Sequence, residues 1–94
     1  MSKGRKVIRP DSFDQMYRQL NQYHRRLVDE AIEKISKNPL IGKELRGRLK
    51  GYRSYEVTPS FRLVYKVSSR GKVILVAVDS RKTIYHKLRR MRAT

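Results

Sequence analysis

The chain has 94 residues, 38% of them hydrophobic and 34% charged, which suits one small domain and is too apolar for wholesale disorder. Without a cysteine it has no disulfide scaffold, thiol catalysis or cysteine-bound zinc. The longest apolar run, Val73–Val78, is far shorter than a membrane span, and no signal-peptide core follows the N-terminus. We therefore expect residues 1–94 to form a single cytoplasmic domain with no membrane partner.

The net charge is +16, from 24 Lys and Arg against 8 Asp and Glu. Three quarters of it lies in residues 43–94, and the tail from Arg81 to Thr94 holds six basic residues and no acidic one. A small domain needs only about 2–8 net charges for solubility, and self-repulsion destabilises a folded state with more. The charge predicts a polyanionic partner: nucleic acid first, then an acidic membrane surface or protein segment.

The first elements predicted are a short strand and a helix. Lys6–Arg9 is a strand candidate that Pro10 closes, and Ser12 with Gln15 fits a capping box at a helix start. One apolar stripe then follows at helical spacing: Phe13, Met16, Tyr17 and Leu20.

A second, longer helix is predicted from about Tyr23 to Lys37, after a break at Asn21. Its apolar stripe consists of Leu27, Val28, Ala31, Ile32 and Ile35. Asn38, as a left-handed cap, and Pro39 are expected to end it. We expect the two closely joined helices to form a hairpin that packs on a sheet.

Three strands are predicted next, over Tyr52–Val57, Phe61–Val67 and Val73–Val78. The first two alternate, whereas the third is a continuous apolar run typical of a central strand buried on both faces. Hairpin-length connections indicate an antiparallel meander. The fold class is therefore α+β, in the order β-α-α-β-β-β, with the basic tail ending as a short helix or a loose arm.

Arginines and a tyrosine gather at the predicted sheet. Arg53 and Arg62 are expected to be near cross-strand neighbours, and Arg81 follows the third strand with Tyr85 four residues later. Like charges placed opposite each other cost free energy, whereas a phosphodiester would neutralise them and arginines stabilise a pentacoordinate phosphate. A tyrosine beside these cations can act as an acid or base. A solvated basic strand face with a tyrosine at the core edge is an equally good interpretation.

Other chemistry has little support. His24 and His86 lie far apart and match no zinc, magnesium or catalytic-triad spacing, and no phosphate-binding P-loop is present. We expect neither a metal nor another cofactor.

The segment from Lys43 to Lys50 is a basic loop that enters the sheet. Its four cations are Lys43, Arg46, Arg48 and Lys50. We favour the interpretation that they bind phosphates over the interpretation that this is an ordinary exposed loop. Glu44 is a candidate base, although a lone exposed carboxylate is more often a salt-bridge partner. Tyr55 is the better candidate for stacking on bases, and Tyr52 for the core.

Taken together, these motifs resemble the RelE/ParE superfamily of toxins from toxin–antitoxin pairs, over about Val7 to Leu88. The segments that carry the resemblance are Leu45-Arg46-Gly47, Gly51-Tyr52-Arg53-Ser54-Tyr55, Phe61-Arg62-Leu63-Val64-Tyr65, Val78-Asp79-Ser80-Arg81 and Ile84-Tyr85. The family's fold matches the order of elements given above.

The RelE branch consists of metal-independent endoribonucleases that cut mRNA in the ribosomal A site, where the ribose 2′-hydroxyl attacks the adjacent phosphate. The resemblance implies that Arg62 stabilises the transition state and Arg81 binds phosphate. It also implies that Arg53 helps to stabilise charge and that Tyr85 transfers a proton or stacks on a base. Glu44 lies near the base of a related branch.

This sequence departs from the most active members, because Tyr55 stands where they carry a Lys and Ser80 where many have a His. The interval from Arg81 to Tyr85 is also shorter. A ParE-like gyrase inhibitor without nuclease activity, or a non-catalytic RNA-binding module, therefore stays open as an alternative.

The resemblance implies an acidic antitoxin that covers the cationic face, with the toxin monomeric outside that complex. The basic loop and the tail, including Lys82 and Lys87, are expected to bind ribosomal RNA with strong salt dependence.

Overall fold

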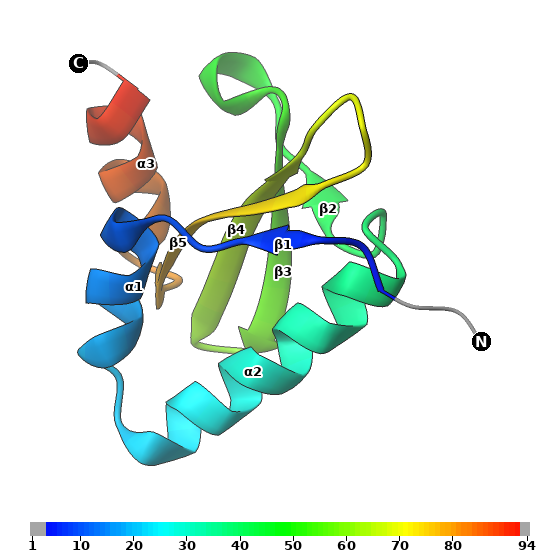
Figure 1. Cartoon of the computed structure of the whole chain (residues 1–94). Helices are drawn as coiled ribbons and strands as arrows, with labels where there is room; N and C mark the ends of the chain where they lie inside the picture. Colours follow the sequence, from blue (N-terminus) through cyan, green and yellow to red (C-terminus); the bar gives the residue numbers. More distant parts are fainter. Residues whose placement is uncertain (1–3, 93–94) are drawn as a thin grey trace.

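The computed structural model describes residues 4–92, which form helices around one five-stranded sheet (Figure 1). The elements in chain order are β1 (Val7–Ile8), α1 (Asp11–Arg18), α2 (Gln22–Lys37), β2 (Lys43–Glu44), the 3₁₀ helix η1 (Gly47–Leu49), β3 (Tyr52–Thr58), β4 (Phe61–Val67), β5 (Val73–Ser80) and α3 (Ile84–Arg92). The predicted α+β class is confirmed. None of the helices within residues 4–92 has the length and apolarity needed to cross a membrane.

Both predicted N-terminal helices form, but their caps differ from those expected. Pro10 is the N-cap of α1 and no side chain caps this helix, so the capping box predicted from Ser12 and Gln15 is wrong. In α2 the Asn21 side chain accepts a hydrogen bond from the backbone N–H of His24, which satisfies one of the free donors of the first turn. The C-cap Asn38 has φ −142°, so it is not left-handed as expected.

The helices pack on the sheet as predicted, with α1 against β5 and α2 against β3. They open away from their connection in Figure 1 instead of lying side by side, so the hairpin is an open V. This arrangement lets both helices cover one face of the sheet.

The sheet has the strand order β1-β5-β4-β3-β2. The predicted antiparallel meander is confirmed for β3, β4 and β5, and β2 adds a short antiparallel strand beside β3 that the sequence did not suggest. β1 pairs in parallel with β5, and the chain between them comprises the two helices and the strands β2, β3 and β4. β5 therefore has neighbours on both sides, as its continuous apolar run predicts.

Apolar side chains form one core cluster on each face of the sheet. The cluster under α1 and α2 consists of Phe13, Val28, Ala31, Ile35, Leu63, Tyr65, Val73, Leu75 and Val78. The cluster on the opposite face consists of Leu49, Val64, Ala77, Ile84 and Leu88. We call these the α2 face and the α3 face of the sheet.

The basic tail forms the helix α3 over its described part, up to Arg92, which decides between the helix and the loose arm; residues 93–94 lie outside the described residues. Ile84 and Leu88, one turn apart, are both buried in the cluster of the α3 face. The amphipathic spacing therefore docks the tail on the sheet, while Arg89 and Arg90 are exposed.

Candidate functional site

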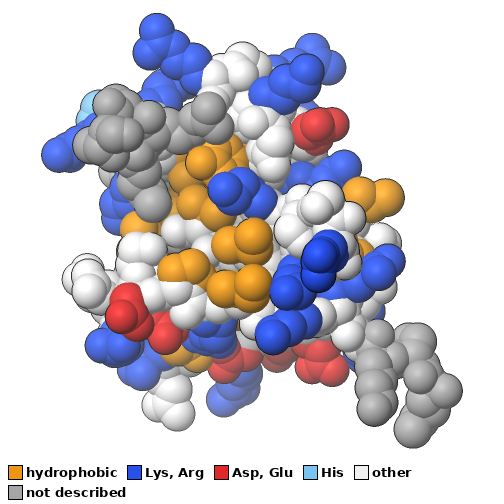
Figure 2. Space-filling model, turned by 45° about the horizontal axis from the view of Figure 1, so that its top comes forward, with side chains coloured by type: hydrophobic (Ala, Val, Ile, Leu, Met, Phe, Trp, Pro, Cys, Tyr) orange, Lys and Arg blue, Asp and Glu red, His pale blue; other side chains and the backbone are white. Residues whose placement is uncertain are grey.

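Lysines and arginines dominate the outer surface of the molecule. Figure 2, which brings the upper side of Figure 1 forward, shows Lys and Arg side chains around much of that view, with hydrophobic side chains gathered near its centre and few acidic groups. This distribution fits the net charge of +16. A surface of this kind attracts a polyanion over a long range.

Arg62 lies at the start of β4 and is held by the turn between β3 and β4. Its Nη1 donates to the carbonyl oxygens of Thr58 (3.0 Å), Pro59 (3.3 Å) and Phe61 (3.3 Å). Its Nη2 lies 3.3 Å from Glu56 Oε1 in an ion pair, and only 14% of the Arg62 side chain is exposed. The guanidinium is therefore fixed in position while Nε and one N–H of Nη2 have no acceptor within the described residues.

Arg81 is brought to the same turn by its backbone. The Arg81 N–H donates to the carbonyl oxygen of Ser60 at 2.7 Å, which ties the end of β5 to the β3–β4 turn. The Arg81 side chain is exposed. A fixed, mostly buried arginine and an exposed one thus flank one turn, and Arg81 directly follows the third predicted strand, as expected.

Tyr85 lies on α3 over the middle of the sheet. Its hydroxyl is 3.3 Å from the Oγ of Ser54 on β3, and the Tyr85 side chain is half-buried against the cluster of the α3 face. Ser54 and Glu56 point to this same face, and Glu56 is the cross-strand partner of Arg62. Tyr85, through Ser54, and Arg62 are therefore on one face of the sheet, with the Arg62 guanidinium directed to the β3–β4 turn.

Asp79 links this face to α3. It lies opposite Arg62 in the pairing of β4 with β5. Its carboxylate accepts hydrogen bonds from Ser80 N (2.7 Å), Thr83 Oγ1 (2.9 Å) and Lys87 Nζ (2.8 Å). Burial alone would raise the pKa of Asp79, but these hydrogen bonds and the charge of Lys87 outweigh it and hold the pKa below its usual value.

Arg53 does not lie beside Arg62, so that expected neighbourhood is wrong. The partner of Arg53 on β4 is Tyr65, and the pairing shifts between Glu56 and Thr58. Arg53 points to the α2 face, where its Nη1 donates to the carbonyl oxygens of Gly42 (2.7 Å) and Leu40 (3.4 Å). Its position supports a role in holding the loop between α2 and β2.

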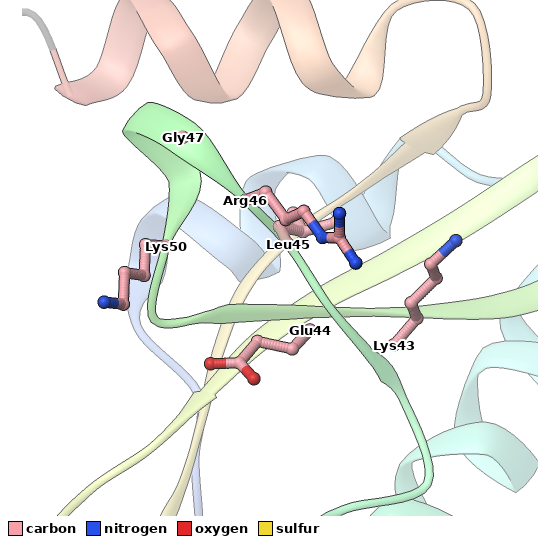
Figure 3. Close-up of a pocket in the computed structure, with 6 residues that line it drawn as sticks. All are labelled: Lys43, Glu44, Leu45, Arg46, Gly47 and Lys50. Carbon is pink, nitrogen blue, oxygen red and sulfur yellow. The ribbon is translucent and has the colours of Figure 1, made fainter.

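The basic loop forms an open pocket of about 400 Å³ lined by Lys43, Glu44, Leu45, Arg46, Gly47 and Lys50 (Figure 3). Gly47 (φ 66°) and Gly51 (φ 98°) adopt left-handed conformations that let the chain reverse into β3. In Figure 3 the Glu44 carboxylate points away from Lys43 and Arg46. Glu44 of β2 lies opposite Arg53 of β3 in the strand register. The structure therefore does not bring this candidate base to Arg62 and Arg81.

The remaining predicted RNA contacts fall in different environments. Arg48 and Lys82 are exposed, whereas Lys87 is engaged by Asp79. Tyr55, which was expected to be exposed beside Arg53 for stacking on bases, is instead partly buried against the cluster of the α2 face, so that expectation is wrong. Tyr52 packs against the other cluster, as expected for a core residue, with Lys66 Nζ 5.4 Å from its ring centroid.

Three residues of this site were missed by sequence reasoning: Ser54, Glu56 and Asp79. The alternation in β3 does place Ser54 and Glu56 on the face of Arg62, and that signal was available. The contact of Asp79 with Lys87 needs the docked helix α3, so no local pattern indicates it.

Comparison with known proteins identifies the family. Residues 7–89 match the model of the ParE-like toxin of type II bacterial toxin–antitoxin systems. The chain belongs to this toxin family. The resemblance to RelE/ParE toxins drawn from the sequence is therefore confirmed, and no curated protein matches the sequence.

Solved toxin structures share the fold of this ParE-like toxin. The RelBE2 toxin–antitoxin complex from Mycobacterium tuberculosis has 25% identity and a TM-score of 0.75, covering 86% of this chain and 95% of that one. The isolated E. coli RelE toxin has 18% identity and a TM-score of 0.70, covering 93% and 97%. The YoeB/ParE toxin from Agrobacterium tumefaciens has 22% identity and a TM-score of 0.68, covering 80% and 97%.

Proposed function

We propose that this ParE-like toxin is a cytoplasmic, metal-independent endoribonuclease that cuts mRNA in the ribosomal A site and so stops translation. The observation that carries the proposal is that the backbone of Arg81 bonds to the turn that holds the Arg62 guanidinium, with Tyr85 on the same face of the sheet as Arg62. Two arginines of this kind suit a phosphodiester whose charge grows in the transition state.

In this proposal the ribose 2′-oxygen loses its proton and bonds to the adjacent phosphorus. The bond from phosphorus to the 5′-oxygen of the next nucleotide breaks, and that oxygen takes up a proton, which leaves a 2′,3′-cyclic phosphate. The free N–H groups of Arg62 and the exposed guanidinium of Arg81 stabilise the pentacoordinate phosphate. Tyr85 transfers a proton or stacks on a base, with Ser54 holding its hydroxyl.

Arg53 and Glu44 have weaker roles in the proposal. The Arg53 guanidinium is engaged by backbone carbonyls on the α2 face, so its contribution is to position the loop that leads into β2. Glu44 lies in β2, paired with Arg53, and acts on RNA only if the ribosome brings the substrate to that edge. The cations of the basic loop bind ribosomal RNA phosphates.

We also propose an acidic antitoxin as the partner in the resting cell. The net charge of +16 favours an acidic chain. The similar M. tuberculosis structure is a toxin–antitoxin complex. A partner that folds while it wraps the cationic surface would block both arginines.

A second candidate function is inhibition of DNA gyrase without RNA cleavage. It is favoured by the family model, which is that of ParE-like toxins, and by Tyr55, which stands in place of a Lys and is packed into the α2 face. A non-catalytic RNA-binding module is the third possibility.

Primer extension on an mRNA translated in a cell-free system separates these functions. The nuclease proposal predicts new cuts that require engaged ribosomes and are lost in Arg62→Ala and Arg81→Ala. Intact mRNA with blocked translation would indicate a non-cleaving ribosome binder. Intact mRNA with normal translation would point to gyrase, which a supercoiling assay would then test.

A further inference from the structure

A second arginine cluster lies away from the Arg62 turn, between α1 and the start of α2. Its pocket has a volume of about 390 Å³ and is lined by Tyr17, Gln22, Arg25, Arg26 and Asp29. We call it the arginine pocket. None of its residues belongs to the site described above.

Arg25 is held in this pocket without a partner. Its side chain is half-buried, and its Nε is buried with no hydrogen-bond acceptor in residues 4–92. A buried N–H of a charged group that lacks an acceptor costs free energy, because it has lost its water. An anion that enters the pocket would supply the missing acceptor.

Two arginines and one acidic residue, Asp29, line the pocket, so the lining keeps a net positive charge. Asp29 is one turn after Arg25, but its carboxylate accepts a hydrogen bond from the Tyr17 hydroxyl at 2.8 Å, and neither Arg25 nor Arg26 has an ion pair in the described part of the chain. The first turn of α2 has no acidic residue. Two cations near the positive end of a helix are unfavourable for stability, so the folded state lacks the negative charge that this corner needs.

His24, next to Arg25 in the chain, connects the start of α2 to Phe61, the residue before Arg62 in β4. The His24 ring lies 4.3 Å from the ring of Phe61, and the carbonyl oxygen of Phe61 accepts from Arg62. Tyr23, which is 63% exposed, stands beside the pocket at the start of α2. An exposed aromatic ring among arginines is suited to single-stranded nucleic acid, whose phosphates bind the arginines and whose bases stack on the ring.

We propose that the arginine pocket binds a backbone phosphate of a single-stranded RNA that continues from the Arg62 turn, with Tyr23 as a stacking platform. This inference extends the proposed function by naming a second phosphate subsite. Arginine suits it because its planar fork donates two parallel hydrogen bonds to one phosphate. An acidic peptide is the competing ligand that the experiment must separate.

The test is fluorescence anisotropy of the full-length protein with a labelled, 2′-O-methylated oligouridylate, which cannot be cut through its 2′-hydroxyl. The double variant Arg25→Gln/Arg26→Gln should bind about tenfold more weakly, as expected when one charge-assisted hydrogen bond is removed. The slope of log affinity against log salt should become shallower by about 0.7 for each phosphate that the variant no longer neutralises. The matched control is Lys34→Gln/Lys37→Gln, which removes the same charge about 15 Å further along α2 and should leave the slope unchanged.

Two further variants guard against misfolding. Arg26→Gln changes an exposed side chain and should weaken RNA binding without lowering Tm. Arg25→Met removes the unpartnered Nε, so Tm should stay the same or rise while RNA affinity falls. A lower Tm with parental RNA affinity would overturn the inference, because Arg25 would then be structural.

The remaining outcomes also decide whether the arginine pocket binds an RNA phosphate. Equal salt slopes for the arginine variant and the lysine control would overturn the inference, as would an arginine variant that no longer binds poly-glutamate but binds RNA like the parent. If the parent binds the RNA through this pocket but never cuts mRNA on ribosomes, the proposed function fails and the phosphate subsite stands.

Discussion

The Tyr65 hydroxyl holds the loop between α2 and β2 in place, and Tyr65→Phe tests this directly. Tyr65 is fully buried, and its hydroxyl donates to the Pro39 carbonyl oxygen at 2.7 Å and accepts from the Gly42 N–H at 2.9 Å. Pro39 and Gly42 are themselves buried. The substitution keeps the ring but leaves one buried acceptor and one buried donor without partners.

Each buried group left unsatisfied costs about 1–3 kcal/mol, so the variant should lose at least about 2 kcal/mol of unfolding free energy. For a domain of this size, about 4–8 °C of Tm accompanies each kcal/mol, which predicts a drop of at least about 8 °C. Burial also raises the pKa of Tyr65. The neutral hydroxyl therefore stabilises the fold below the ordinary tyrosine value of about 10, and the parent loses this contribution as pH rises through the folded-state pKa.

Urea unfolding followed by circular dichroism measures both effects. Tyr23→Phe is the matched control, because Tyr23 is 63% exposed and the change should stay within about 0.5 kcal/mol. The Tyr65 variant should also lack the component of alkaline destabilisation that comes from this hydroxyl. A Tyr65→Phe protein as stable as the control would refute the reasoning, because the hydroxyl would then not hold the loop.

Four residues give further predictions. Arg81→Ala should abolish mRNA cleavage with little change in Tm, because Arg81 is exposed. Arg62→Ala should abolish cleavage and also lower Tm, because the mostly buried guanidinium holds the β3–β4 turn. Equal losses of stability in the two variants would contradict this prediction. The pKa of Asp79 is lowered in the folded state, so its contribution to stability is present above the unfolded value of about 4 and is lost as pH falls through the folded-state pKa. Asp79→Asn should therefore show a weaker loss of stability than the parent as pH falls below about 4, and parallel acid-unfolding curves would argue against the network. Gly42→Ala would place a methyl group 2.6 Å from the Tyr65 hydroxyl oxygen, so it should lower stability by about 1–3 kcal/mol in the same urea assay, and a neutral effect would show that the loop moves freely.

Hydrophobic periodicity was sufficient to predict the elements with a clear apolar pattern. The predicted ranges for β3, β4 and β5 end within two residues of the observed bounds, and the second helix begins one residue earlier than expected. Along β4 the alternation also assigned the correct faces, with Leu63 and Tyr65 toward the helices and Arg62 on the opposite side. These features depend on local sequence, so a single chain reveals them.

The predictions that were wrong concern features that depend on contacts between residues distant in the sequence. Arg53 and Arg62 were expected to be neighbours, but the irregular pairing between Glu56 and Thr58 sets the register, and turn length alone does not indicate it. β2 has only two residues and exists because β3 provides its partner. Tyr55 was expected to be an exposed stacking residue, but α1 and α2 cover its face of the sheet.

The family was accessible from sequence, because the motifs that carry the resemblance lie in order along three strands and a turn. The arginine pocket was not accessible from sequence, since it forms only where Tyr17 of α1 meets α2. A charge pattern on one helix does not indicate that a cation is buried without a partner.

The most direct test of the central claim is primer extension on an mRNA translated in a cell-free system, with the parent protein and Arg81→Ala side by side. We predict new cuts for the parent, present only when ribosomes are engaged, and intact mRNA for the variant, whose Tm should match that of the parent. An mRNA that stays intact with the parent protein, or is cut equally by the variant, would contradict the assignment of a ribosome-dependent nuclease centred on the Arg62 turn.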